Sequence, residues 1–357
     1  MKQNDIHYYE WLLRKYARHI RHYKNRYKDK TTYDKSSMAI SDHRYNAPEN
    51  LSICGNSGPT IGYFQKYIRH LKNNKANFYD TLFFDVSNIK TLTIDALMYL
   101  LAIIKNFDYK IKYFKKSKKE QSKYPKYSEL KIKKISGNLP NDPSIRTKFL
   151  MSGFLNYVSI PDKPVEKAFD NVQIREGSLI DTSVAREITT FVIDAFEDDR
   201  RNTKYIYNML IELMSNTNNH AYEKEKQFIN HWFIFARFDK NDEKIAITFL
   251  DTGEGIPRTV KKKLSEKVVY TDSQLIQASF DDSFNRSTTK FTHRGKGLPR
   301  IYDYCVKKRI DSITVISQKG KVVLMSNGEN KIYNLFRPLT GTIYYWEIKK
   351  NNLRSEL

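Results

Sequence analysis

The 357-residue sequence has few cysteines, no long apolar segment and a deficit of acidic residues. Its two cysteines, Cys54 and Cys305, lie far apart and form no C-x-x-C pair, so we expect free thiols rather than a disulfide or a metal site. The longest apolar run covers residues 96–104, well below the ~18 residues that a membrane-spanning helix needs, which predicts no membrane insertion. The first residues lead into His, Tyr and Arg rather than into an apolar core, so we expect no secretory signal and a cytoplasmic location.

The acid deficit leaves 62 basic residues against 40 acidic ones, a formal net charge of +22. Such an excess favours acidic partners, which include nucleic acid, anionic lipid and acidic proteins. Aromatic residues make up 13% of the chain, a share that is typical of a folded protein and not of a disordered one. The length suffices for two modest domains, each with its own core.

Residues 1–50 are basic and rich in aromatics. Tyr9, Leu12, Leu13 and Tyr16 recur at helical spacing, which predicts a basic N-terminal helix followed by a linker. Basic and aromatic side chains of this kind could follow a phosphate backbone and stack on bases, so nucleic acid is one candidate partner. The alternative, which we prefer, is that the aromatic stripe packs against the next domain.

Residues 51–164 alternate short strands with helices. The pattern predicts strands at 81–86 and 130–135 and a helix from residue 94 to 107. Asp142-Pro143 then supplies an N-cap and a first-turn proline for a further helix. Alternation of this kind predicts an α/β domain.

Residues 209–221 form a predicted helix with two polar side chains on one face. Glu212 and Asn216 are four residues apart, so they can meet the same ligand. The apolar strand at 245–250 then runs into Asp251, which Gly253 and Gly255 follow. An acidic group at a strand end offers a hydrogen-bond acceptor, and the glycines let the backbone pass close to a flat ligand.

Two further segments complete the pattern. Gly295 and Gly297 precede a predicted helix at 298–308 and are flanked by Arg294 and Lys296, an arrangement suited to phosphate groups. Residues 339–342 lead into a last strand at 343–347. Each motif alone occurs often by chance, and their order carries the information.

In order and spacing, these motifs resemble the GHKL superfamily of ATP-binding proteins, which includes gyrase B, MutL and the histidine kinases. The resemblance covers residues 179–357 and implies an α/β sandwich with a mixed sheet that binds ATP and Mg²⁺. Asn216 would be the metal ligand, Asp251 would accept from the adenine amino group, and Thr342 would support that contact. The implied ATP-binding residues are Asn216, Asp251, Gly253, Gly255, Arg294, Gly295, Lys296, Gly297, Leu298 and Thr342. Residues 258–294 would form a lid over the nucleotide.

Glu212 is the predicted catalytic residue. In the ATPases and in the anti-sigma serine kinases of this superfamily, a glutamate four residues before the asparagine acts as a general base. A base that activates water can equally activate a serine, so Glu212 alone does not separate the two reactions. We expect a slow regulatory ATPase whose lid controls a protein partner. The alternatives are an anti-sigma-type serine/threonine kinase and a non-catalytic ATP sensor in a nucleic-acid or defence complex.

Residues 51–164 resemble a STAS domain, the fold of anti-sigma antagonists, through the segments at 83–89 and 93–97. Where that family carries a phosphorylatable serine, this sequence has Ile94, which indicates a fixed docking platform rather than a phosphorylation switch. The expected fold class is therefore α/β (α+β), with domains at 51–164 and 179–357. The identity of the partner and the oligomeric state stay open.

Overall fold

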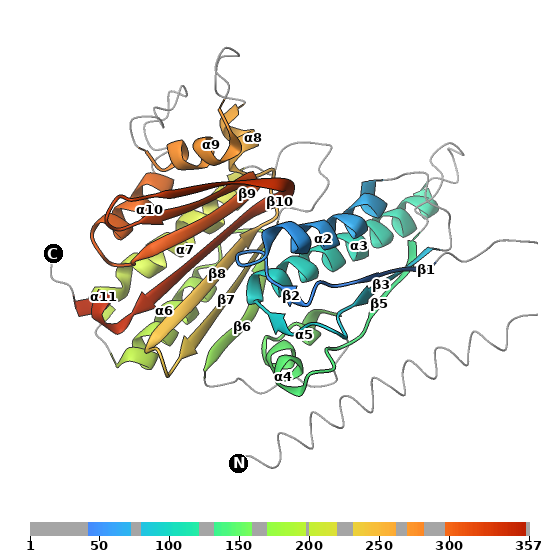
Figure 1. Ribbon diagram of the computed structural model, residues 1–357, viewed down its shortest axis with the longest axis horizontal. Helices are drawn as coiled ribbons and strands as arrows, with labels where there is room; N and C mark the ends of the chain where they lie inside the picture. Colours follow the sequence, from blue (N-terminus) through green and yellow to red (C-terminus); the bar gives the residue numbers. More distant parts are fainter. Residues whose placement is uncertain are drawn as a thin grey trace, which may run out of the picture. The chain divides into compact units, whose positions relative to one another are not determined.

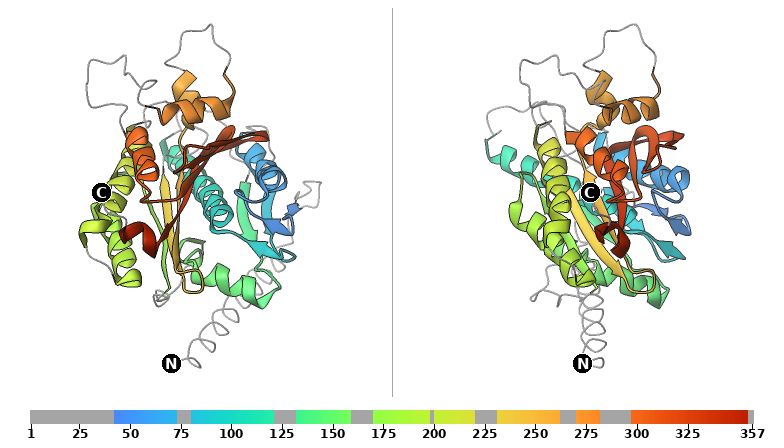
Figure 2. Two further views of the ribbon diagram at one scale, coloured as in Figure 1. Left: turned by 60° about the vertical axis from the view of Figure 1, so that its left-hand side comes forward. Right: turned by 90° about the vertical axis from the view of Figure 1, so that its left-hand side faces the viewer.

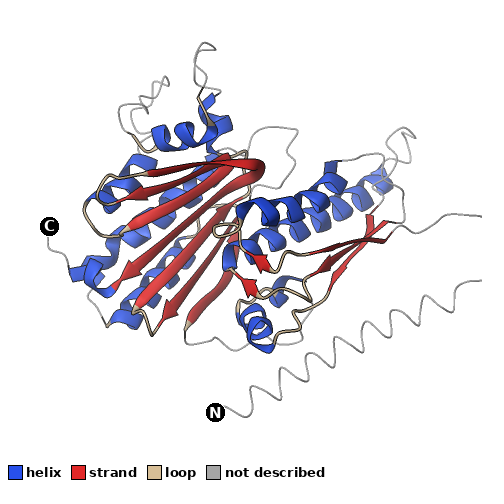
Figure 3. Cartoon of the chain, viewed as in Figure 1, coloured by secondary structure: helices blue, strands red, loops and turns tan. Residues whose placement is uncertain are grey.

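The computed structural model describes residues 42–72, 80–120, 132–158, 170–197, 200–219, 231–261, 270–281 and 297–354. All of them belong to one compact unit, Ser41–Leu357. The architecture is mixed α/β, with a five-stranded sheet that has helices on both faces (Figures 1 and 3). The helix predicted within residues 1–50 lies outside the described residues.

The five-stranded sheet has the order β6-β7-β8-β10-β9. Its strands are β6 (Asn171–Gly177), β7 (Trp232–Asp239), β8 (Lys244–Asp251), β9 (Ser312–Met325) and β10 (Lys331–Lys349). All four pairings are antiparallel, so the expectation of a mixed sheet was wrong. Short connections join β7 to β8 and β9 to β10, and a connection of a few residues can join only antiparallel neighbours.

One face of this sheet is covered by α6 (Thr182–Phe196), α7 (Arg200–Asn219) and α10 (Gly297–Val306). Alternate strand residues point toward these helices, as Ile234 and Ala236 of β7 do. Figure 2 shows the helices lying along the sheet on this side. We call this side the α7 face.

The opposite face is covered by α2 (Ser57–Lys72) and α3 (Ile94–Glu120). Phe233 and Phe235 point toward them, in alternation with the residues of β7 that face α7. Residues 96–103 of α3 are all buried, because this helix also packs against a second sheet. The longest apolar run of the sequence, residues 96–104, therefore lies in a helix that is buried between two sheets. We call this side the α3 face.

The second sheet is parallel, with the order β1-β3-β5, and α2 and α3 are the crossovers that parallel neighbours require. Its strands are β1 (Asp42–Asn46), β3 (Asp80–Asp85) and β5 (Ile132–Gly137), and a small parallel pair joins β2 (Asn50–Leu51) to β4 (Thr91–Leu92). The end of the predicted linker is thus a strand, because residues 42–46 pair with β3. The hydroxyl of Tyr67 in α2 donates a hydrogen bond to the carbonyl of Tyr45 in this strand.

The predicted elements of this region are present. The strand at 81–86 is β3, the helix from residue 94 is α3, which runs on to Glu120, and the strand at 130–135 is β5. Two short helices follow, α4 (Pro143–Met151) and α5 (Leu155–Val158). Asp142 caps α4 as expected, because its carboxylate accepts the backbone N–H of Ile145. Among the described residues, no helix is long and apolar enough to span a membrane.

Candidate functional site

Asp251 is the last residue of β8, and its side chain lies on the α7 face. Phe249, two positions earlier, belongs to the core under α7, and strand side chains alternate between the two faces. The carboxylate is largely buried, and its Oδ1 accepts the backbone N–H of Gly253 at 2.7 Å. Burial and the nearby charge of Asp251 raise the pKa of Tyr344 on the same face. The predicted adenine acceptor is therefore a fixed, oriented group at the end of a central strand.

Thr342 lies directly opposite Asp251 in the neighbouring strand β10. The two residues are ninety-one positions apart in the chain, and the antiparallel register of β8 and β10 brings them together. Thr342 is almost fully buried, and its Oγ1 lies 3.0 Å from Oγ of Ser317. The first glycine motif (Asp251, Gly253 and Gly255) and the threonine motif (Gly341 and Thr342) thus meet in one place.

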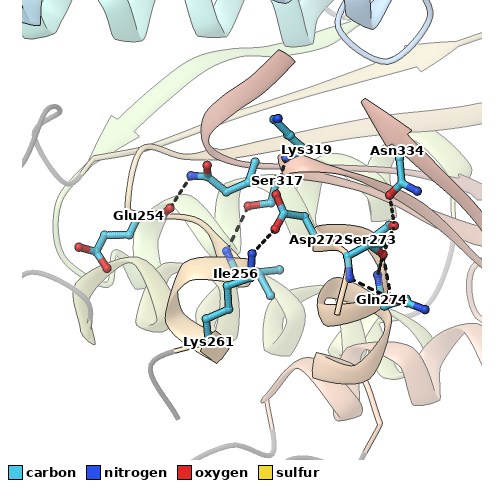
Figure 4. A network of polar contacts seen from close by, with 11 residues as sticks. Glu254, Ile256, Lys261, Asp272, Ser273, Gln274, Ser317, Lys319 and Asn334 are labelled. Atoms are coloured by element: carbon cyan, nitrogen blue, oxygen red, sulfur yellow. Dashed lines mark hydrogen bonds and ion pairs between the residues drawn. The ribbon is translucent and has the colours of Figure 1, made fainter. Parts of the chain in front are cut away.

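Ser317 of β9 joins these segments, and the sequence analysis missed it. Its fully buried hydroxyl accepts the backbone N–H of Ile256 at 3.1 Å (Figure 4). The same hydroxyl donates to the carbonyl of Gly341 at 2.9 Å. The side chain of the next residue, Gln318, donates to the carbonyl of Glu254 at 2.8 Å. The only signal in the sequence is a serine that interrupts an apolar strand, which by itself does not indicate a role.

Two glycines of this region are required by their backbone conformations. Gly255 has φ +88° and Gly341 has φ +92°, values that L side chains rarely adopt. A Cβ on Gly255 would lie 2.6 Å from Oγ of Ser317, and a Cβ on Gly341 would collide with the backbone carbonyl of Asp251. The loop after β8 and the bulge of β10 therefore approach each other more closely than any larger residue permits.

Glu212 and Asn216 lie on α7, at the border of its buried face. Leu213 and Met214 of the same helix are buried in the core, whereas Glu212 and Asn216 are half-buried. The side-chain nitrogen of Asn216 is buried and has no hydrogen-bond partner among the described residues. A buried amide without a partner is uncommon in folded proteins and calls for an explanation.

Gly297 opens α10 and lies against the side chain of Glu212. A Cβ added to Gly297 would overlap the Glu212 carboxylate, so the two segments are in close contact. Leu298 packs at the edge of the core on the α7 face. The structure thus brings the asparagine motif (Glu212 and Asn216) together with the described part of the second glycine motif (Gly297 and Leu298).

Three predicted ATP-binding residues, Arg294, Gly295 and Lys296, lie outside the described residues. The predicted lid at 258–294 is described only in part, as most of α8 (Ile256–Lys261) and all of α9 (Asp272–Ser279). Both helices are tied to the sheet, since Asp272 pairs with Lys261 at 2.7 Å and accepts the backbone N–H of Lys319 at 3.0 Å (Figure 4). The predicted lid therefore includes two helices that belong to the folded body.

A cluster of charged residues links α3 to the loop after β8. Lys105 of α3 pairs with Glu176 of β6 at 2.6 Å, and the other carboxylate oxygen of Glu176 lies 3.9 Å from Nδ1 of His231. Burial favours a raised pKa for Glu176, but the nearby His231 and the hydrogen bond from Lys105 outweigh burial and lower it. His231 and Thr252 exchange hydrogen bonds, so the cluster adjoins the first glycine motif.

A pocket of about 420 Å³ lies between α9, α10 and β9 and contains none of the residues predicted to bind ATP. Its ionisable lining residues other than tyrosine are two aspartates, Asp281 and Asp303, and phosphate groups are not the ligands that such a lining favours. In the described ranges, no group of three or more His, Cys, Asp or Glu side chains could hold a metal ion. Both cysteines are free thiols, as expected.

The sequence matches no protein-family model and no curated protein.

Proposed function

We propose that this chain binds Mg-ATP through the region at 179–357, in the manner of the GHKL superfamily. The observation that carries the proposal is that motifs far apart in the sequence meet in pairs. Thr342 lies opposite Asp251 in adjacent strands, and Gly297 lies against Glu212. Unrelated glycine and acidic motifs would have no reason to meet in this combination.

The end of the candidate site that carries Asp251 and Thr342 is suited to hold adenine. A carboxylate accepts a hydrogen bond from the amino group of the base, and Thr342 supports this contact from the next strand. Because the backbone N–H of Gly253 holds Asp251, the acceptor is oriented before the base binds. The resemblance assigns the same roles to these two residues.

Asn216 is suited to hold Mg²⁺ together with the phosphate groups. Mg²⁺ prefers oxygen ligands and is often held by few protein groups plus the phosphates of its substrate. The side-chain nitrogen of Asn216 is buried and has no hydrogen-bond partner in the part of the chain that the structure describes. No hydrogen bond of that nitrogen to a described residue therefore opposes a rotation that turns the side-chain oxygen toward a metal. When bound, the metal would neutralise the charge of the phosphate oxygens.

Glu212 is suited to act as the general base. Its carboxylate lies beside Gly297, at the N-terminus of the helix that the resemblance places at the phosphates. A carboxylate in this position can take a proton from an attacking water. We propose slow hydrolysis of ATP, with residues 258–294 transmitting the state of the nucleotide to a protein partner.

Calorimetric titration of the full chain with Mg-ATP, with and without EDTA, tests the binding site. Asn216→Ala should abolish Mg²⁺-dependent binding because it removes the metal ligand. The matched control is Asn208→Ala, which removes a half-buried asparagine from the same helix and should bind as the wild type does. Unchanged affinity in both Asn216→Ala and Asp251→Asn would end the proposal.

A second measurement follows labelled Mg-ATP over time and identifies the reaction. Released phosphate supports hydrolysis, and its loss in Glu212→Gln with ATP binding retained would assign the base. Label on the protein would instead identify a kinase, and tight binding without turnover would identify a sensor. Intact-mass analysis should find no phosphate added between residues 51 and 164.

A further inference from the structure

Two helices on the α3 face contact β10 just before Thr342. Gln65 of α2 donates to the carbonyl of Pro338 at 2.9 Å, and the Arg337 side chain lies against Gly62 of the same helix. Further along, the hydroxyl of Tyr99 in α3 accepts the backbone N–H of Thr340 at 3.2 Å. The segment that leads to the threonine motif is therefore held by residues of the N-terminal half of the chain.

The contact with Tyr99 falls on an irregular part of β10. Leu339 pairs with Gln318 of β9 and Thr342 pairs with Ser317, so Thr340 and Gly341 lie in a bulge with no partner residue in β9. A bulge leaves backbone groups outside the ladder, and these groups need other partners. Tyr99 supplies one for Thr340 from the α3 face, and Ser317 supplies one for Gly341 from the α7 face.

Tyr99 is well placed for this role. It lies within the buried stretch of α3, where its ring is fixed on all sides and only 1% of its surface is exposed. Burial raises the pKa of Tyr99 to about 12, so its hydroxyl stays protonated. A rigid hydroxyl of this kind fixes the position of the N–H group that it accepts.

We propose that Tyr99 is a positioning residue for the nucleotide site, an inference that rests on the proposed binding of Mg-ATP. Tyr99 fixes the bulge at Thr340 and Gly341, which directly precedes Thr342 and holds Gly341 against the backbone carbonyl of Asp251. The N-terminal half of the chain thereby contributes to adenine recognition without touching the nucleotide. Any ligand that shifts α3 would change the affinity for ATP, and ATP would in turn change the affinity for that ligand.

Tyr99→Phe tests the proposal, because it removes the hydroxyl and keeps the ring. We expect ATP to bind about three- to tenfold more weakly, the effect of one lost hydrogen bond, with kcat unchanged because Glu212 is not disturbed. Hydrogen exchange of the nucleotide-free protein should be faster in residues 337–345.

Tyr67→Phe is the matched control. Tyr67 is also fully buried in this half of the chain, and its hydroxyl donates to the carbonyls of Tyr45 and Phe83 in the second sheet. It should lower the thermal stability and leave ATP affinity and exchange in residues 337–345 unchanged.

The outcomes separate this inference from the proposed function. If the wild type binds ATP and Tyr99→Phe binds it equally well, the positioning role is wrong and the ATP site stands. If the wild type does not bind ATP, the proposed function fails. Unchanged exchange in residues 337–345 of Tyr99→Phe would overturn the positioning role in either case.

Discussion

The two ends of the candidate site differ in what surrounds their glycines. At the end that carries Asp251, a side chain on Gly341 would meet a backbone carbonyl, which belongs to a central strand and cannot move away. At the other end, a side chain on Gly297 would first meet the side chain of Glu212, which can turn aside. The Asp251 end is therefore part of the fold, whereas the Glu212 end depends on side-chain positions. Changes at the first should lower stability, and changes at the second should lower activity alone.

Gly341→Ala should have the largest effect on stability. The new Cβ requires an unfavourable positive φ and collides with backbone, which together cost about 2–5 kcal/mol. Chemical denaturation of the purified protein measures the loss. Gly328→Ala is the control, since Gly328 has φ +80° and open space around it, so only the cost of the positive φ of about 1–2 kcal/mol remains. Equal losses of unfolding free energy in the two variants would show that the close approach at Gly341 does not contribute to stability.

Ser317→Ala should have an intermediate effect. It leaves the buried N–H of Ile256 without its acceptor, which costs about 1–3 kcal/mol, and it should also weaken ATP binding. Thr248→Val is the comparison in the same sheet, because the fully buried hydroxyl of Thr248 has no hydrogen-bond partner among the described residues. Replacing it with a methyl group should be neutral or stabilising. Thermal unfolding of both variants measures the difference. Equal shifts in melting temperature would contradict the role of Ser317 in joining these segments.

Gly297→Ala should have the smallest effect on stability, within about 0.5 kcal/mol, because its nearest neighbour is the flexible side chain of Glu212. The same change displaces the carboxylate of Glu212, so phosphate release should fall toward the level of Glu212→Gln. A loss of stability as large as that of Gly341→Ala would remove the difference between the two ends. A stable variant with full turnover would show that Glu212 has no catalytic role.

The sequence predicted the parts of the site that depend on local pattern. Apolar periodicity and the residues that interrupt it located the strand that ends at Asp251, the helix that carries Asn216 and the helix that begins at Gly297. The assignment of these parts to ATP binding stays a prediction.

The rest depends on contacts between distant segments, which periodicity does not encode. Tyr99 lies in an apolar helix, where an aromatic residue is expected in the core for its ring, and the partner of its hydroxyl is 241 residues away. Ser317 bonds to the start of α8 and to the bulge of β10, which meet only in the folded protein. The order and direction of the strands likewise depend on pairing between distant segments. Periodicity does not predict this pairing, and the expectation of a mixed sheet was wrong.

The cover on both faces of the five-stranded sheet limits how the chain can be divided. A fragment that begins at residue 170 would keep all five strands and lose α2 and α3. Phe233, Phe235, Leu250 and Ile343 would then face water, and an apolar patch of this kind promotes aggregation. The region from residue 170 onward is thus not expected to fold well when it is produced alone, and a substitution in α2 or α3 can also affect the five-stranded sheet.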